Sequence, residues 1–73
     1  MARWKHTFRM PLHNADGAVV TTLEVTFVTD AEYPDDLEDV ALEALDGMAA
    51  TREVDELVYR GDVEQCGREP VNA

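Results

Sequence analysis

Polar and apolar residues alternate with a period of two near the start of the chain. Residues 3–12 place one mainly apolar set on a single face, namely Trp4, His6, Phe8, Met10 and Leu12. Such alternation is typical of a half-buried strand, which Pro11 should end or confine to an edge. Residues 14–17 then contain Asn, Asp and Gly, which favour a turn, and residues 18–29 alternate again and are rich in Val and Thr. The pattern therefore predicts a β-hairpin.

The period changes to that of a helix after residue 33. Apolar residues recur at spacings of three and four, namely Leu37, Val40, Ala41, Ala44, Leu45 and Met48. Pro34 suits a first helical turn, and the acidic residues that follow it would lie at the positive end of the helix dipole. We expect an amphipathic helix over about 34–50, with Gly47 as a weak point.

A third strand is predicted at about 54–65. In this strand Leu57, Tyr59 and Val63 should face the core, whereas Val54, Glu56, Val58 and Arg60 should face away, and Gly61 would mark a bulge. Residues 1–66 would form a single domain, and residues 67–73 a flexible C-terminal tail.

These elements predict an α+β fold of type ββαβ, with three strands and one helix packed on one face of the sheet. Connection rules place the first strand at the centre, in sheet order 2-1-3, with strands 2 and 3 running in the same direction. The other face of the sheet is left uncovered by this chain.

Charge changes the picture more than composition does. The 73 residues carry a net charge of −10, yet the first nine contain Arg3, Lys5 and Arg9 and no acid. This balance disfavours direct binding to nucleic acid or to an anionic membrane, and it favours basic protein partners. A GC-rich genome or adaptation to high salt would produce the same acidity without any function.

Location and chemistry are constrained mainly by what the sequence lacks. It contains no apolar run of about 18 residues, no signal-peptide pattern and no disulfide framework, so we expect a cytoplasmic protein. The metal-ligand types His6, His13 and Cys66 have no ligand spacing, and serine is absent. We therefore expect no catalytic, metal-binding or cofactor-binding residues, no cofactor and no enzymatic activity. His6 lies on the apolar face of the first strand, so we expect it to be a hydrogen-bonded core histidine.

Two surfaces remain as candidates for association. The first is an acidic ladder on the helix around an exposed leucine, formed by Asp35, Asp39, Leu42, Glu43 and Asp46. The second is the open sheet face, where a second copy could pack on Arg3, Lys5, Arg9, Val20 and Val28, and the unpaired strand edges are further sites for a second copy.

The leading interpretation is a small acidic non-enzymatic protein-interaction module, homodimeric through the open sheet face or the edge strands. Size and composition suit an accessory protein of a phage, a high-GC bacterium or a salt-adapted organism. The alternative is a nucleic-acid mimic whose acidic helix occupies the basic groove of a host protein.

Overall fold

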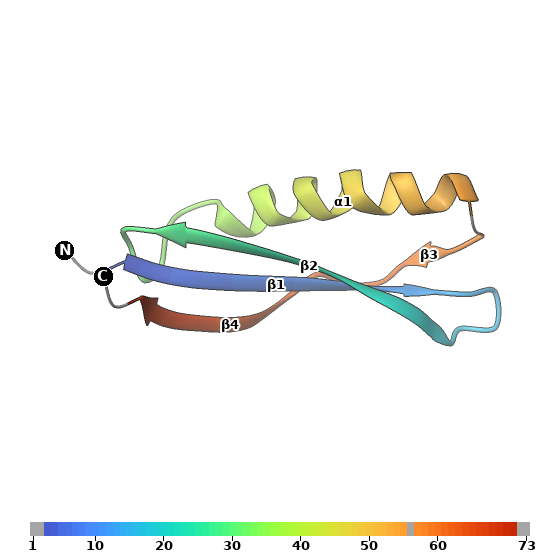
Figure 1. The fold of residues 1–73 in the computed structure, drawn as a ribbon, viewed down its shortest axis with the longest axis horizontal. Helices are drawn as coiled ribbons and strands as arrows, with labels where there is room; N and C mark the ends of the chain where they lie inside the picture. The colour runs from blue at the N-terminus through green and yellow to red at the C-terminus, as the bar shows by residue number, and fades with distance from the viewer. Residues whose placement is uncertain (1–2, 56, 72–73) are drawn as a thin grey trace.

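The fold is α+β, with one helix lying along a four-stranded antiparallel sheet (Figure 1). The computed structural model describes residues 3–55 and 57–71. The strands are β1 (Arg3–His13), β2 (Val19–Thr29), β3 (Tyr59–Arg60) and β4 (Glu64–Val71), and the helix is α1 (Leu37–Asp55). β2 pairs with one edge of β1, while β3 and β4 pair with the other edge in succession. The central position predicted for the first strand is confirmed.

The hairpin forms as its sequence predicts, except that Pro11, expected to end the first strand or lie at an edge, is paired within the central strand β1. β1 and β2 pair in regular register from Trp4 opposite Thr29 to Leu12 opposite Thr21. In the turn, the Asn14 side-chain oxygen accepts the N–H groups of Asp16 and Ala18 at 2.9 and 3.0 Å. Gly17 adopts a φ of 85°, a conformation that costs glycine little.

The core lies between the helix-facing side of β1 and one line of residues on α1. Its buried hydrophobic side chains are Phe8, Met10, Leu12, Ala41, Leu45, Ala49 and Val58. The predicted inward face of the first strand and the predicted amphipathic helix are thus confirmed. Val40 and Met48 belonged to the same predicted stripe, but they are 48% and 40% exposed.

The helix begins and ends later than the sequence indicated. Pro34 and Asp35 precede it, because Asp36 adopts a left-handed φ of 60° that an α-helix cannot contain. The carbonyl of Asp36 instead accepts the N–H of Val40, one turn into α1, at 3.1 Å. At the other end α1 continues through residue 50 to Asp55.

The prediction of a single third strand at 54–65 is wrong. α1 occupies its first part, and two strands, β3 and β4, follow. The predicted faces are also reversed at three positions, since Leu57 and Tyr59 are exposed and Val58 is buried. Val63 does pack against the core, whereas Val54 and Glu56 lie outside the residues whose side chains are described.

Pro11 explains why the third strand divides. Its carbonyl accepts the Gly61 N–H at 2.8 Å and therefore points toward β3 and β4. The N–H and C=O of one residue point to the same side of an antiparallel strand, so the N–H that proline lacks would have pointed there too. Gly61 lies in the resulting connection, and the bulge expected there occurs instead opposite Thr7 and Phe8.

The segment expected to be a flexible tail is, in its described part, a paired strand. Residues 67–71 belong to β4, and the pairing extends to Val71 opposite Arg3. The molecule is consequently long and thin, at 45 × 18 × 18 Å. Its radius of gyration is 13.9 Å, against about 11 Å for a compact domain of this length.

Candidate functional site

The edge of β2 is the longest unpaired strand edge among the described residues. β2 has eleven residues, Val-Val-Thr-Thr-Leu-Glu-Val-Thr-Phe-Val-Thr, and Glu24 is its one charged side chain. The strand contains no proline, and its pairing with β1 is regular from Thr21 onward. Natural edge strands are usually protected from further pairing by prolines, charges or bulges. β2 has almost none of this protection.

The opposite edge of the sheet is protected in each of these ways. β4 contains Pro70 together with the charged residues Glu64, Arg68 and Glu69. Its register with β1 shifts at Thr7 and Phe8, which leaves an extra residue on β4. The contrast between the two edges singles out β2 as an edge that can accept another strand.

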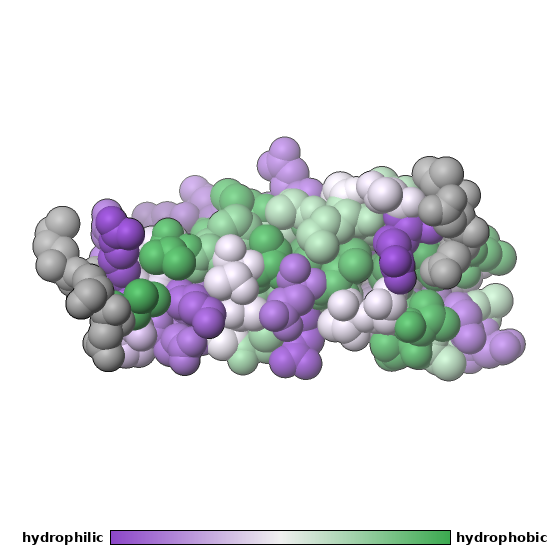
Figure 2. All heavy atoms as spheres, in the orientation of Figure 1, coloured by the Kyte–Doolittle hydropathy of each residue, from purple (hydrophilic) through white to green (hydrophobic). Residues whose placement is uncertain are grey.

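One side of α1 extends the β2 edge with apolar side chains. Asp46 and Glu53 contact Arg60 of β3, so their side of the helix faces β3 and β4. Val40, Ala44 and Met48 lie at four-residue spacing on the opposite side and therefore over β2. In Figure 2, hydrophobic atoms, in green, gather in a band over α1 and β2.

We call this region the β2 edge surface: the β2 strand together with Val40, Ala44 and Met48 of α1. The helix-facing residues of β2, namely Leu23, Val25 and Phe27, are only partly buried and pack against the core. Phe27 meets Phe8 edge to face, with ring centroids 6.4 Å apart. The surface therefore joins free backbone hydrogen-bonding groups to a row of apolar side chains.

The predicted acidic ladder is broken in the structure. Asp35 precedes the helix, and Asp46 forms an ion pair with Arg60 at 3.0 Å. Asp39 and Glu43 remain exposed on the outer side of α1, one turn apart, and Leu42 is 42% exposed. The continuous stripe of one sign that the sequence indicated is thus reduced to two carboxylates.

Arg60 holds the end of α1 to β3 through a second carboxylate. Its Nε donates to Glu53 Oε1 at 2.7 Å, and its terminal Nη2 donates to Oε2 at 3.2 Å. These hydrogen bonds lower the pKa of Glu53, although partial desolvation opposes the shift. The pair ties the last turns of the helix to the sheet.

The open sheet face is charge-balanced and not basic as a whole. Arg3, Lys5, Arg9 and Val28 are exposed there, as predicted, and Val20 is exposed at the irregular end of β2. Acids of β4 now lie beside the cations: Lys5 is 3.3 Å from Glu69, and Arg9 is 3.9 Å from Glu64. Sequence reasoning missed Glu69 as a partner because it placed residues 67–73 in a tail outside the sheet, and it missed Glu64 because the predicted strand at 54–65 had no register with the first strand.

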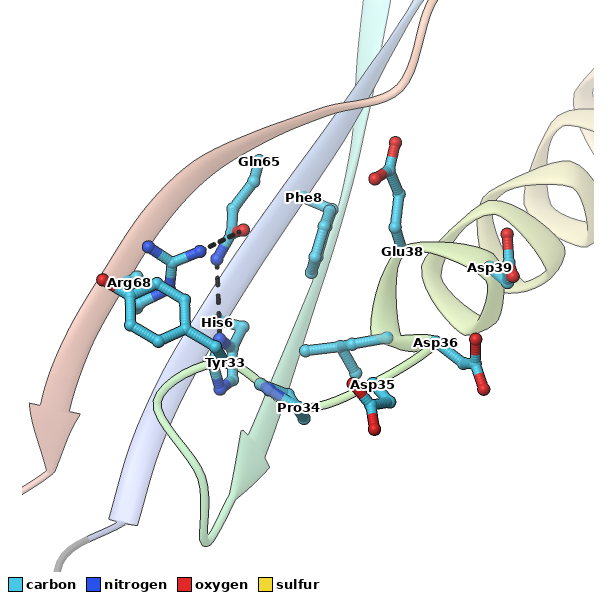
Figure 3. A pocket seen from close by; sticks show the side chains of 11 residues that line it. His6, Phe8, Tyr33, Pro34, Asp35, Asp36, Glu38, Asp39, Gln65 and Arg68 are labelled. Atoms are coloured by element: carbon cyan, nitrogen blue, oxygen red, sulfur yellow. Dashed lines mark hydrogen bonds between the residues drawn. The ribbon is translucent and has the colours of Figure 1, made fainter.

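A pocket of about 540 Å³ opens where the start of α1 meets β4 (Figure 3). Its floor is His6, which is 1% exposed. Its rim carries Tyr33, whose ring lies 4.3 Å from the Arg68 guanidinium carbon, and four acids, Asp35, Asp36, Glu38 and Asp39. Neither Tyr33 nor Arg68 was a candidate from the sequence, because the two are brought together only by the pairing of β4.

His6 is fully engaged in hydrogen bonds. The Thr29 hydroxyl donates to the Ala31 carbonyl at 2.8 Å, and His6 Nε2 lies 2.8 Å from that hydroxyl and 3.2 Å from the same carbonyl oxygen. The Gln65 amide nitrogen lies 3.5 Å from Nδ1 (Figure 3). The hydrogen-bonded core histidine predicted from the sequence is confirmed, and its ring nitrogens already have partners.

Across residues 3–55 and 57–71, no three His, Cys, Asp or Glu side chains come together in a way that could hold a metal ion. Cys66 is a free, exposed thiol whose Sγ lies 3.5 Å from the Thr7 carbonyl oxygen. In the described part of the chain, α1 lacks the apolar length that crossing a membrane requires.

Comparison with known proteins gives no relative to guide the assignment. No family model, curated protein or solved structure matches the chain.

Proposed function

We propose that this protein is a non-enzymatic protein-interaction module that binds its partner by strand addition at the β2 edge. The observation that supports this proposal is the difference between the two sheet edges. β4 carries proline, charges and a bulge in its middle, whereas the eleven residues of β2 carry one charge, no proline and a register shift only near the turn, at Val20. An added strand would satisfy the outward N–H and C=O groups of β2 through main-chain hydrogen bonds.

The side of α1 that lies over β2 would supply the apolar part of the contact. Val40 and Met48 are 48% and 40% exposed, and Ala44 between them leaves room for a close approach. Burying apolar surface of this kind contributes about 25 cal/mol per Å². Main-chain pairing and the apolar row together would give both orientation and affinity.

The acidic helix offers a competing site, that of a nucleic-acid mimic. Its exposed carboxylates, Asp39 and Glu43, favour a basic partner, as does the net charge of −10. A mimic needs a run of negative charges spaced along its surface, and the ion pair of Asp46 with Arg60 shortens that run. The β2 edge surface therefore has the stronger support.

Site-specific photo-crosslinking in the native cells tests the proposal. One crosslinking side chain is placed at Val40 on the β2 edge surface, at Glu43 on the outer helix, or at Lys5 on the open sheet face; all three positions are exposed. We expect a protein adduct from Val40 and little from the other two positions. Adducts from Glu43 alone would support the nucleic-acid mimic, and adducts from Lys5 alone would place the partner on the open sheet face. If none of the three positions gives an adduct, the proposal of a protein-interaction module is contradicted.

A further inference from the structure

The β2 edge surface has features that suit a second copy of this chain. An antiparallel pair of identical strands is related by a two-fold axis, so one surface can satisfy both molecules. We propose that two copies pair through β2 to form an eight-stranded antiparallel sheet, with the two α1 helices side by side on the same face. This inference rests on the proposed function, since it names the partner at that surface.

The monomer exposes more surface to solvent than a compact protein of its mass. Its accessible surface is 5009 Å², whereas a compact monomer of 8.2 kDa exposes about 4,500 Å². Of the seven hydrophobic residues that are wholly or nearly buried in the described part of the chain, three are small, namely Ala41 and Ala49 of α1 and Val58 after it. Small domains with limited cores are commonly stabilised by association.

The β2 edge surface is large enough for a stable dimer. Eleven strand residues span roughly 37 Å at the usual rise per residue. Multiplied by the 18 Å thickness of the molecule, this length gives roughly 670 Å² per copy, or about 1,300 Å² in total. Specific protein interfaces bury about 1,200–2,000 Å². The edge of β2 with its helical row therefore meets the lower end of that range.

The residues of the β2 edge surface can pack against the same residues of a second copy. A two-fold axis at Glu24 would place two carboxylates directly opposite each other, which is unfavourable. An axis at Val25 instead places Leu23 opposite Phe27 of the second copy, and Thr21 opposite Thr29, on the helix-facing side. On α1, Val40 and Met48 lie four residues to either side of Ala44, so the helical row is also close to symmetric.

Light scattering of the purified protein during size-exclusion chromatography tests this inference. We expect twice the monomer mass of 8.2 kDa. Val40→Lys and Met48→Lys should each raise the dissociation constant by about 100-fold, because each change acts on both copies and burial of a half-exposed side chain is worth about tenfold per copy. Leu42→Lys is the matched control, since Leu42 is 42% exposed and lies on the side of α1 that faces β3 and β4. Circular dichroism confirms that each variant is folded.

Hydrogen exchange measured above and below the dissociation constant gives a second readout. We expect concentration-dependent protection of β2 amides and none of β4 amides. A wild-type protein that stays monomeric at about millimolar concentration would overturn the second-copy inference. A dimer that survives Val40→Lys but is lost in Lys5→Glu would also overturn it, in favour of the sheet face. In either case an adduct from Val40 with a different protein would still support strand addition at β2, so the two proposals fail separately.

Discussion

Gly61 lies in the connection between β3 and β4, where the surrounding atoms leave no room for a larger side chain, so the effect of Gly61→Ala on stability can be predicted. A Cβ added at Gly61 would lie 2.6 Å from Pro11 Cγ, 2.9 Å from His13 Cε1 and 3.0 Å from the Pro11 carbonyl oxygen. The proline ring is rigid, and the carbonyl accepts the Gly61 N–H at 2.8 Å, so neither can move away without loss. Gly61→Ala must therefore displace the connection or break that hydrogen bond.

The expected loss of stability in Gly61→Ala is the sum of three typical free-energy contributions. Overpacking costs about 1–3 kcal/mol, and a lost backbone hydrogen bond costs about 0.5–1.5 kcal/mol. Alanine also restricts the unfolded chain more than glycine does, which offsets this loss of stability by about 0.4–1 kcal/mol. We expect Gly61→Ala to lower the free energy of unfolding by about 1–3 kcal/mol. Gly47→Ala is the matched control, because Gly47 lies within α1 with nothing within 4 Å of its added Cβ. It should raise the free energy of unfolding by about 1 kcal/mol.

Urea unfolding at one protein concentration measures both changes, since association at the β2 edge surface would make stability concentration-dependent. On heating, Gly61→Ala should lower the melting temperature and Gly47→Ala should raise it, by about 4–8 °C per kcal/mol for a domain of this size. A Gly61→Ala variant as stable as the wild type would show that the close approach of the connection to Pro11 is not fixed, and the account of why the third strand divides would lose its support.

Two further predictions concern the core and the attachment of the helix. Leu45→Ala should lower the free energy of unfolding by about 2–5 kcal/mol in a urea titration, because Leu45 is wholly buried, whereas Leu42→Ala, at a position that is 42% exposed, should cost under about 1 kcal/mol. Arg60 lowers the pKa of Glu53, so the stabilising effect of the pair is present above the unfolded pKa of glutamate, about 4.3, and is lost as the pH falls through the lower folded value. Unfolding of wild type and Glu53→Gln, followed from pH 7 to pH 3, should show a difference that shrinks toward zero; a difference that is constant with pH would contradict the ion pair.

The hairpin and the core face of the helix could be predicted because their patterns are local. In β1 one face is buried at every second position from His6 to Leu12, and burial of that kind appears directly as alternation in the sequence. The line Ala41, Leu45 and Ala49 likewise follows helical spacing. The prediction extended the core too far on α1, since it assumed that Val40 and Met48 would be covered.

β4 could not be predicted by the same reasoning. Its residues are exposed except for Gly67 and Val71, which are partly buried, so no apolar alternation marks it. The strand is held by backbone pairing with β1, which begins some sixty residues earlier. Sequence patterns report burial of side chains and not the completion of a distant backbone ladder. The contact between Tyr33 and Arg68 and the ion pairs of Lys5 and Arg9 were missed for the same reason.

The acidity and the open edge can be explained together, and salt distinguishes this explanation from mimicry. An unprotected apolar edge invites uncontrolled association, while a net charge of −10 keeps molecules apart. The β2 edge surface carries only Glu24 among its charged groups, so it is the orientation in which two like-charged molecules approach at least cost. Raising the ionic strength screens the remaining repulsion, with a Debye length of about 10 Å at 0.1 M and about 3 Å at 1 M. Self-association through β2 should therefore strengthen with salt in sedimentation measurements. Binding of a basic partner through Asp39 and Glu43 should weaken instead, so a dimer that dissociates as salt is raised would show that opposite charges, and not the β2 edge surface, hold it together.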